Sequence, residues 1–140
     1  MVESSDRAGD EARIRELIEE WRLAVVAKDA NALIRHYAPD VVVFDVVPPA
    51  SFRGAAQYRE NWQRWFDGMK GPLAFEMNDV QVVASGDVAY AHSVNRVVIG
   101  ELDNVVRATV CFRRIDGDWR VAHEHASVPL TTDMDPDEKS

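Results

Sequence analysis

Hydrophobic side chains recur every three or four positions between residues 12 and 28, with polar residues between them. This spacing places them along one side of an α-helix, and Asp10 precedes it as a candidate N-cap. A second, shorter helix is predicted over 30–37, with Asp29 as its N-cap. The chain therefore begins with two amphipathic helices.

The remainder of the chain is mostly β-branched or alternates between hydrophobic and polar positions. A strand is predicted to end before Pro48 and Pro49, because proline interrupts strand hydrogen bonding. A third helix is expected between it and four later strands. The expected ranges are strand 41–47, helix 54–69, and strands 73–84, 88–99, 105–115 and 119–128. Helices placed before strands that are joined by short turns indicate an α+β fold with a mainly antiparallel sheet.

The last strand follows a tight turn at residues 116–118, whose sequence Asp-Gly-Asp is typical of a hairpin. Strict alternation would place five of its side chains on one face, which starts apolar and becomes polar. These side chains are Trp119, Val121, His123, His125 and Ser127. Such a strand is typical of a cavity with an apolar bottom and a polar mouth. The alternative is a core strand whose far end reaches solvent.

Composition limits the number of domains and the classes of partner. The 140 residues suit one domain, expected over 12–130. The net charge of −8 is concentrated in residues 1–11 and 131–140, which carry −3 each and are predicted to be flexible acidic tails. No basic stripe favours nucleic acid, and no basic amphipathic helix favours a membrane surface.

Further features suggest where the protein resides. The sequence contains no apolar run of transmembrane length and no signal-peptide core at its amino terminus. Its single cysteine, Cys111, excludes an internal disulfide. A cytoplasmic location is the resulting expectation. No phosphate-binding glycine loop is present, so no nucleotide cofactor is expected, nor any other cofactor.

Several short segments, in order, resemble the nuclear transport factor 2-like superfamily, and in particular its SnoaL-like and ketosteroid isomerase-like members. They are Lys28-Asp29, Tyr37-Ala-Pro-Asp40, Phe52-Arg-Gly54, Gly86-Asp87, Asp116-Gly-Asp-Trp-Arg-Val121 and His123-Glu-His-Ala-Ser-Val-Pro129. The resemblance implies a cone-shaped fold, with three amino-terminal helices on a curved sheet. It also implies an internal pocket for a small apolar molecule. The fold supports many activities and does not select one.

Asp45 is the leading catalytic candidate. The segment from Tyr37 to Asp45 resembles the isomerase segment in which an acid at this spacing is the general base. Burial in an apolar strand would raise the pKa of an aspartate and improve it as a base near neutrality. The alternative is an aspartate that caps the turn before Pro48.

The same resemblance shows where this chain departs from the isomerases. In ketosteroid isomerases, a tyrosine and a neutral aspartic acid form the oxyanion hole. Here the tyrosine position falls near Trp21, and the acid position near Cys111 or Thr109. Steroid isomerisation is therefore not expected.

His123 and His125 form a second candidate site. A three-residue turn would place them beside Cys111 and Thr109, with Arg107 beside Ser127 on the same face. An imidazole transfers protons near neutral pH, and Arg107 could bind a carboxylate or an enolate. The alternatives are a hydrogen-bonded ladder, a dimer contact, or a zinc site completed by His92, Asp45 or Glu76. None of those ligands has a recognised spacing, and no metal is expected.

Other candidate ligand contacts have structural alternatives. Arg96 interrupts an apolar strand, where it would either bind an anion in the pocket or form a surface ion pair. Tyr58 and Trp62, with Trp65, would line the pocket or pack in the core.

The expected function is a cofactor-independent acid/base enzyme of the isomerase, cyclase or dehydratase type, acting on a small apolar carbonyl compound. Asp45 would remove a proton, His125 would return one, and Arg107 would stabilise negative charge. His123, Trp21, Tyr58, Trp62 and Arg96 would contact the substrate. The alternative is a non-catalytic ligand-binding or dimerisation module. A homodimer is also expected, through the sheet face opposite the histidines, because that face carries exposed apolar residues.

Overall fold

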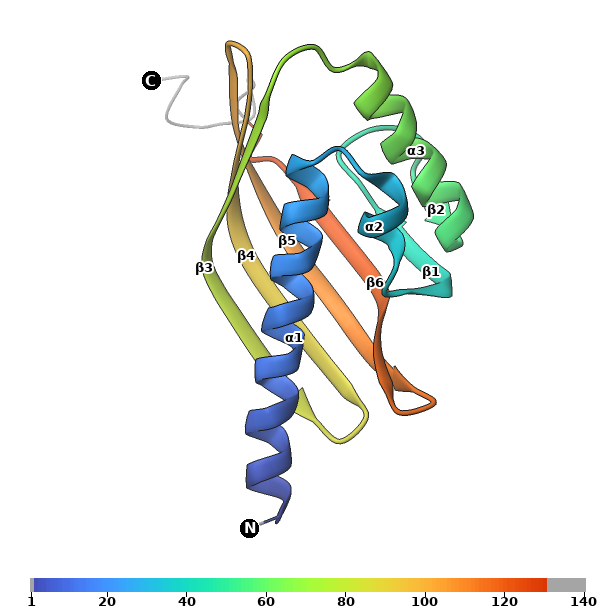
Figure 1. Ribbon diagram of the computed structural model, residues 1–140, viewed down its shortest axis with the longest axis vertical. Coiled ribbons are helices and arrows are strands. Elements are labelled where there is room, and N and C mark those ends of the chain that lie inside the picture. The colour runs from blue at the N-terminus through green and yellow to red at the C-terminus, as the bar shows by residue number, and fades with distance from the viewer. Residues whose placement is uncertain (1, 131–140) are drawn as a thin grey trace.

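The computed structural model describes residues 2–130, as three helices and six strands (Figure 1). The expected tail at 131–140 lies outside the described residues. The helices are α1 (Val2–Val26), α2 (Ala30–Ile34) and α3 (Ala55–Gly68). The strands are β1 (Tyr37–Phe44), β2 (Phe52–Arg53), β3 (Leu73–Ser85), β4 (Val88–Ile99), β5 (Leu102–Ile115) and β6 (Asp118–Ser127).

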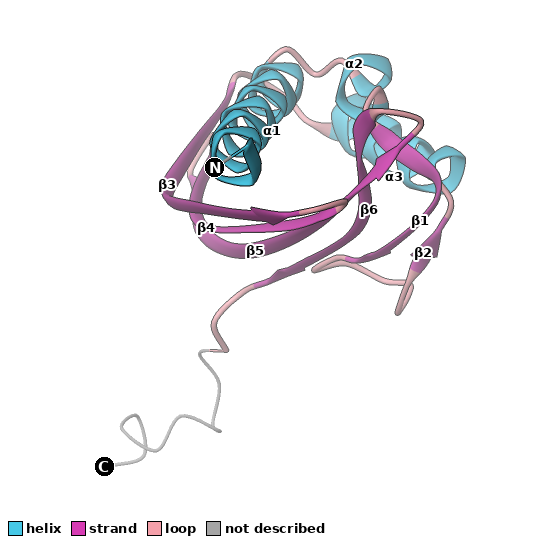
Figure 2. Ribbon diagram, turned by 90° about the horizontal axis from the view of Figure 1, so that it is seen from below, coloured by secondary structure: helices cyan, strands magenta, loops and turns pink. Residues whose placement is uncertain are grey.

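The strands form one sheet in the order β2-β1-β6-β5-β4-β3. All neighbours pair antiparallel except β1 and β6, which are parallel. The sheet curls around the helices, which occupy its concave side (Figure 2). The α+β fold with three helices on a curved, mainly antiparallel sheet is therefore confirmed.

The helices differ from expectation mainly at their ends. Asp29 caps α2 as predicted, because its Oδ1 accepts the Ala32 N–H at 3.1 Å. Asp10, the expected cap of the first helix, instead lies inside α1, which begins ten residues earlier than predicted. Its carboxylate accepts hydrogen bonds from Arg114 at 2.7 Å and from the Trp119 indole at 3.3 Å. These contacts fasten α1 to the sheet, and flexibility before Asp10 stays a prediction.

The core has two parts on the concave side of the sheet. In the first, Ile14 and Leu17 of α1 pack against Val41, Phe112 and Trp119 of the sheet. The second is formed by side chains from all three helices and from β3, namely Ala24, Val25, Ala30, Leu33, Phe66, Leu73 and Phe75. Trp21 and Trp62 pack against both parts. The two indoles therefore lie where the cores meet.

A β-bulge in β6 reverses the expected facing of its second half. Phe112 pairs with Val121 but Cys111 pairs with His123, so Ala122 is an additional residue on β6. Beyond this bulge Glu124 is buried and His125 is exposed. The prediction that Trp119, Val121, His123, His125 and Ser127 share one face is therefore wrong.

The outer face of the sheet carries both histidines of β6. Ala108, Val110 and Ala126, which were expected on an exposed face, instead line cavities on the concave side. The exposed hydrophobic residues of the outer face are Phe44, Val83, Val88, Tyr90, Val94 and Val105. The face expected to form the dimer is therefore not the exposed one, and the exposed hydrophobic residues lie on the histidine face instead.

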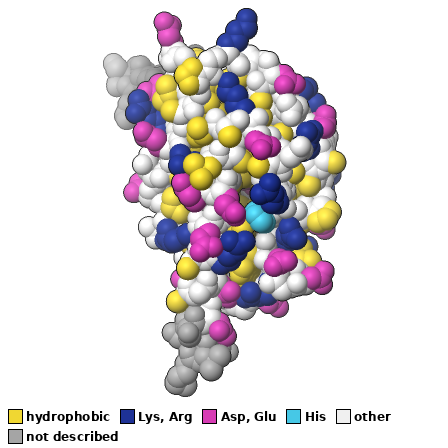
Figure 3. Space-filling view, in the orientation of Figure 1, with side chains coloured by type: hydrophobic (Ala, Val, Ile, Leu, Met, Phe, Trp, Pro, Cys, Tyr) yellow, Lys and Arg dark blue, Asp and Glu magenta, His cyan; other side chains and the backbone are white. Residues whose placement is uncertain are grey.

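The helical side of the molecule has a mixed charge. Acidic and basic side chains are interspersed over it, with no stripe of basic residues (Figure 3). Within residues 2–130, no helix combines the length and the apolar character that crossing a membrane requires.

Candidate active site

A cavity of about 170 Å³ lies between the sheet and helices α1 and α3. Its walls are mostly apolar. They include Val25, Phe75, Val97, Val106, Ala108 and Ala126. Two carboxylates, Asp45 and Glu124, line the same space. An apolar cavity with a few polar groups is the usual form of a small-molecule site.

Four side chains in this region form one hydrogen-bonded chain. The Tyr37 hydroxyl donates to Glu124 Oε1. The Tyr58 hydroxyl oxygen lies 3.1 Å from Glu124 Oε2 and 3.1 Å from Asp45 Oδ2. The second oxygen of Asp45 accepts the Val46 N–H at 2.7 Å. Tyr58 therefore connects a buried carboxylate to one at the cavity wall.

Each member of this chain is held by a different element. Tyr37 begins β1, Tyr58 projects from α3, and Glu124 follows the bulge in β6. Asp45 comes directly after β1, where the chain leaves the sheet. Because β1 and β6 are parallel neighbours, Tyr37 and Glu124 meet although they lie 87 positions apart in the sequence.

Glu124 has a strongly perturbed pKa. It is raised from 4.5 to about 7, mainly by burial and also by the nearby charge of Asp45, while the hydrogen bonds from Tyr37 and Tyr58 oppose the shift. Burial and the charge of Glu124 also raise the pKa of both tyrosines well above 10, so both hydroxyls remain protonated. Glu124 therefore gains and loses a proton near neutral pH.

The protonation state of Glu124 determines which hydrogen bonds the Tyr58 hydroxyl can form, because that hydroxyl has a single proton. A hydroxyl donates one hydrogen bond, yet Tyr58 has a carboxylate oxygen on each side. If Glu124 is protonated, it donates to the Tyr58 oxygen, and Tyr58 donates to Asp45. If both carboxylates are charged, one of them loses its hydrogen bond. The arrangement therefore favours one shared proton.

Three buried polar atoms in the cavity wall have no hydrogen-bond partner. They are Nε1 of Trp21, Nε1 of Trp62 and Oδ1 of Asn95. An unpartnered buried polar group costs about 1–3 kcal/mol. All three residues line the main cavity.

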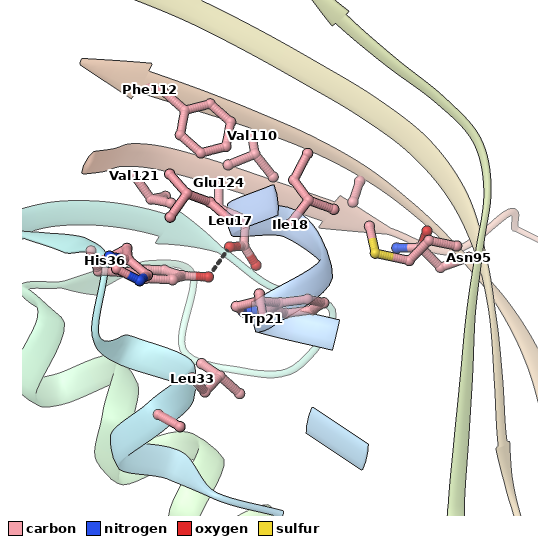
Figure 4. Close-up of a pocket in the computed structure, with 14 residues that line it drawn as sticks. Leu17, Ile18, Trp21, Leu33, His36, Asn95, Val110, Phe112, Val121 and Glu124 are labelled. Carbon is pink, nitrogen blue, oxygen red and sulfur yellow. Dashed lines mark hydrogen bonds between the residues drawn. The ribbon is translucent and has the colours of Figure 1, made fainter. Parts of the chain in front are cut away.

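A smaller chamber of about 50 Å³ lies beside the cavity (Figure 4). Trp21, Asn95, Ala108 and Glu124 line both spaces. In Figure 4 Asn95 lies further along the sheet than Glu124. These residues therefore stand at the junction of the two spaces.

Four of the residues expected at the site do line the cavity. Asp45, Tyr58, Trp21 and Trp62 all contribute to its wall. Tyr58 and Trp62 also pack in the core, so these aromatic residues both line the cavity and contribute to the core.

The other predicted site residues lie outside the cavity, the two histidines because of the bulge in β6 and Arg107 because it alternates with the inward residues of β5. His123 donates its Nδ1–H to the Val42 carbonyl at 2.6 Å, and His125 is exposed. Both rings pack edge-on against Phe44. Arg107 is exposed and donates to the Val128 carbonyl at 3.3 Å. The expected pairs of Arg107 with Ser127, Thr109 with His125 and Cys111 with His123 do form, but on the outer face.

Arg96 also points outward. It forms two hydrogen bonds to Asp103, at 2.9 and 2.6 Å, so its surface ion pair is confirmed. Among residues 2–130, no three His, Cys, Asp or Glu side chains are grouped closely enough to hold a metal ion.

Sequence reasoning missed Glu124, Tyr37 and Asn95. Glu124 stands between two histidines, so strict alternation assigned it to the outer face. Tyr37 was assigned to the end of a helix. Asn95 offered the clearest signal, since it is a polar residue on the hydrophobic phase of the strand predicted over 88–99.

Comparisons with known proteins agree with this architecture. A family model described as a SnoaL-like domain matches residues 14–131. A nuclear transport factor 2-like protein of unknown function from Pseudomonas putida is 38% identical in sequence, with a TM-score of 0.86, over 90% of this chain and 91% of that one. A search of curated proteins finds no match.

More distant solved structures share the fold alone. A provisionally assigned dehydratase of the nuclear transport factor 2-like family from Streptomyces avermitilis is 20% identical, with a TM-score of 0.78, over 89% of this chain and 99% of that one. A provisionally assigned scytalone dehydratase from Novosphingobium aromaticivorans is 14% identical, with a TM-score of 0.74, over 92% and 91% of the two chains.

Proposed function

Because this chain belongs to the SnoaL-like domain family, we propose that it is a cofactor-independent acid/base enzyme of the isomerase, cyclase or dehydratase type. Its substrate is a small, largely apolar carbonyl compound that binds in the cavity lined by Asp45 and Glu124. The observation that carries the proposal is the position of the Tyr58 hydroxyl, 3.1 Å from a carboxylate oxygen of each residue.

Asp45 is the general base in this proposal. Its carboxylate is half-buried at the cavity wall, where a substrate carbon can approach it. Removal of a proton next to a carbonyl group leaves the electron pair on the substrate as an enolate. Asp45 then carries the proton, and the substrate oxygen carries the negative charge.

In this proposal, Glu124 and Tyr58 transfer the abstracted proton away from Asp45 and back to it. When Asp45 becomes protonated, Tyr58 can accept that proton and pass its own to an ionised Glu124. The reverse transfer returns a proton toward Asp45. A carboxyl group with a pKa of about 7 suits this role, because it both gains and releases protons near neutral pH. Since His125 and Arg107 lie outside the cavity, the roles expected for them pass to Glu124 and to the indole N–H groups of Trp21 and Trp62.

A proton-abstraction assay with 5-nitrobenzisoxazole tests the base. This small aromatic compound loses its ring C–H proton to a base while its N–O bond breaks and a coloured cyanophenolate forms. Asp45→Asn should slow the reaction by about 10²–10⁴-fold, the usual contribution of a general base. Asp40→Asn is the matched control, because Asp40 is an exposed aspartate on β1. Equal rates for wild type and Asp45→Asn would reject the proposed base.

The alternative function is a non-catalytic ligand-binding module. The unpartnered polar atoms of Trp21, Trp62 and Asn95 favour binding without requiring turnover. In that case Asp45→Asn changes ligand affinity and leaves the 5-nitrobenzisoxazole rate at the level of free carboxylates. In either case we propose a homodimer formed through the outer face of the sheet, where Tyr90 and Val94 are exposed.

A further inference from the structure

We infer that Asn95 determines specificity by binding a second polar group at the far end of an uncharged ligand. The ligand would have an apolar body with one oxygen at the carboxylate end and another at Asn95. This inference rests on the proposed function, because it names the ligand class of the same cavity.

The first observation is the state of the Asn95 side chain. It is 2% exposed on β4, and its Oδ1 has no hydrogen-bond partner. It lines both the main cavity and the smaller chamber. A carboxamide both donates and accepts hydrogen bonds, so this amide can bind a hydroxyl or a carbonyl group in either orientation.

The second observation is the separation between Asn95 and the carboxylates. In the sheet register, Glu124 lies opposite Val110, and Val110 lies opposite Ala91. Asn95 is four positions beyond Ala91 on the same strand, and β5 lies between the two polar residues. One small polar group therefore cannot contact both Asn95 and Glu124, whereas a molecule with two separated polar groups can.

The third observation concerns charge. Among the described residues that line the two spaces, the ionisable groups near neutral pH are Asp45, Glu124 and His36, and no lysine or arginine is included. Burial lowers the pKa of His36, which favours its neutral form. A carboxylate or phosphate on the ligand would therefore be desolvated beside negative groups without a compensating cation.

The indole groups of Trp21 and Trp62 indicate which type of ligand group suits the carboxylate end of the cavity. Nε1 of Trp21 and Nε1 of Trp62 are buried donors with no hydrogen bond of ordinary geometry, and the tyrosine oxygens of Tyr37 and Tyr58 lie near them. The two rings are nearly perpendicular, with centroids 6.0 Å apart. An oxygen with free lone pairs, as in a ketone or an enolate, supplies an acceptor for these donors. An ammonium group does not, since it has no lone pair.

A series of bicyclic ketones tests this inference by calorimetry at pH 6. Wild-type protein should bind 6-hydroxy-1-tetralone five- to tenfold more tightly than 1-tetralone, the effect of one additional hydrogen bond. The 6-carboxy analogue should bind at least tenfold more weakly than 1-tetralone. Equal affinity for the hydroxylated and unsubstituted ketones would overturn the inference. So would tighter binding of 2-aminotetralin, which is a cation.

Asn95→Leu, which replaces the amide with an apolar side chain of similar size, should remove the preference for the hydroxyl group. Asn78→Leu is the matched control, since Asn78 is an exposed asparagine on β3, and it should keep the preference. A preference retained in Asn95→Leu would overturn the role of Asn95. If that variant fails to fold, the ligand series on wild-type protein still decides. Because binding is measured without turnover, failure here leaves the Asp45 assay unaffected.

Discussion

Replacing Glu124 with glutamine should change how the stability of the protein depends on pH. Glutamine has the shape of a protonated Glu124: its oxygen accepts from Tyr37, its amide donates to the Tyr58 oxygen, and Tyr58 still donates to Asp45. The substitution thus preserves the hydrogen bonds of the neutral state and removes the titration.

The direction of this pH dependence follows from the raised pKa of Glu124. Between 4.5 and about 7 the folded protein binds a proton on Glu124 that the unfolded chain releases. The free energy of unfolding of wild type therefore falls as pH rises through this window. For this shift, wild type loses about 2–3 kcal/mol of stability between pH 5 and pH 8, and Glu124→Gln should not show this loss.

The measurement is urea unfolding of both proteins at several pH values from 5 to 8. The variant should have a similar stability to wild type at pH 5 and should be more stable at pH 8 by about 2–3 kcal/mol. Glu101→Gln, at the exposed turn between β4 and β5, is the control for loss of a carboxylate and should track wild type. A stability difference between Glu124→Gln and wild type that stays constant across this range would refute the argument.

Three other predictions concern the site, the helix contact and the outer sheet face. Tyr58→Phe removes the hydroxyl between Asp45 and Glu124, so turnover of 5-nitrobenzisoxazole should fall at least tenfold and the pH profile should shift, whereas a purely structural role would leave the profile unchanged. Asp10→Asn should lower the free energy of unfolding by about 1 kcal/mol at pH 7, because Arg114 lowers the pKa of Asp10 through its hydrogen bond. That difference should begin to shrink as pH falls below about 4, the ordinary pKa of an aspartate, and should be gone once the lower pKa of the folded state is passed; an undiminished difference in acid unfolding would contradict it. Val94→Lys places a charge on the exposed outer face, so light scattering should give about 15.8 kDa for the variant and twice that mass for wild type; a wild-type monomer would contradict the homodimer.

Features that depend on neighbouring residues could be predicted from the sequence. The cap at Asp29, the third helix and the hairpin turn at 116–118 all follow from local spacing and from the conformational preferences of individual residues. The antiparallel order of β3 to β6 follows from short turns. Asp45 lies at the cavity wall, where the resemblance of its segment implies a site residue, and its role as a base stays a prediction.

Features that depend on distant contacts could not be predicted. The parallel pairing of β1 with β6 joins the strands that come first and last in the sequence and brings Tyr37 to Glu124. Glu124 also required knowledge of the bulge at Ala122, which alternation alone does not reveal. Its charge makes it an unusual interior residue, and two tyrosine hydroxyls from other elements compensate for its burial.

The extra residue at Ala122 determines which side chains in the second half of β6 face the interior, and therefore which groups can transfer protons there. Deleting it would restore strict alternation, so that the two imidazoles beyond it would face the interior and the glutamate between them would face solvent. The rest of the scaffold, including the indoles and the amide on β4, would remain in place. A change of one residue in strand length would thus exchange a carboxylic acid for histidines at the same position of the fold. Homologous sheets that differ here in length are therefore expected to differ in the type of group that transfers protons.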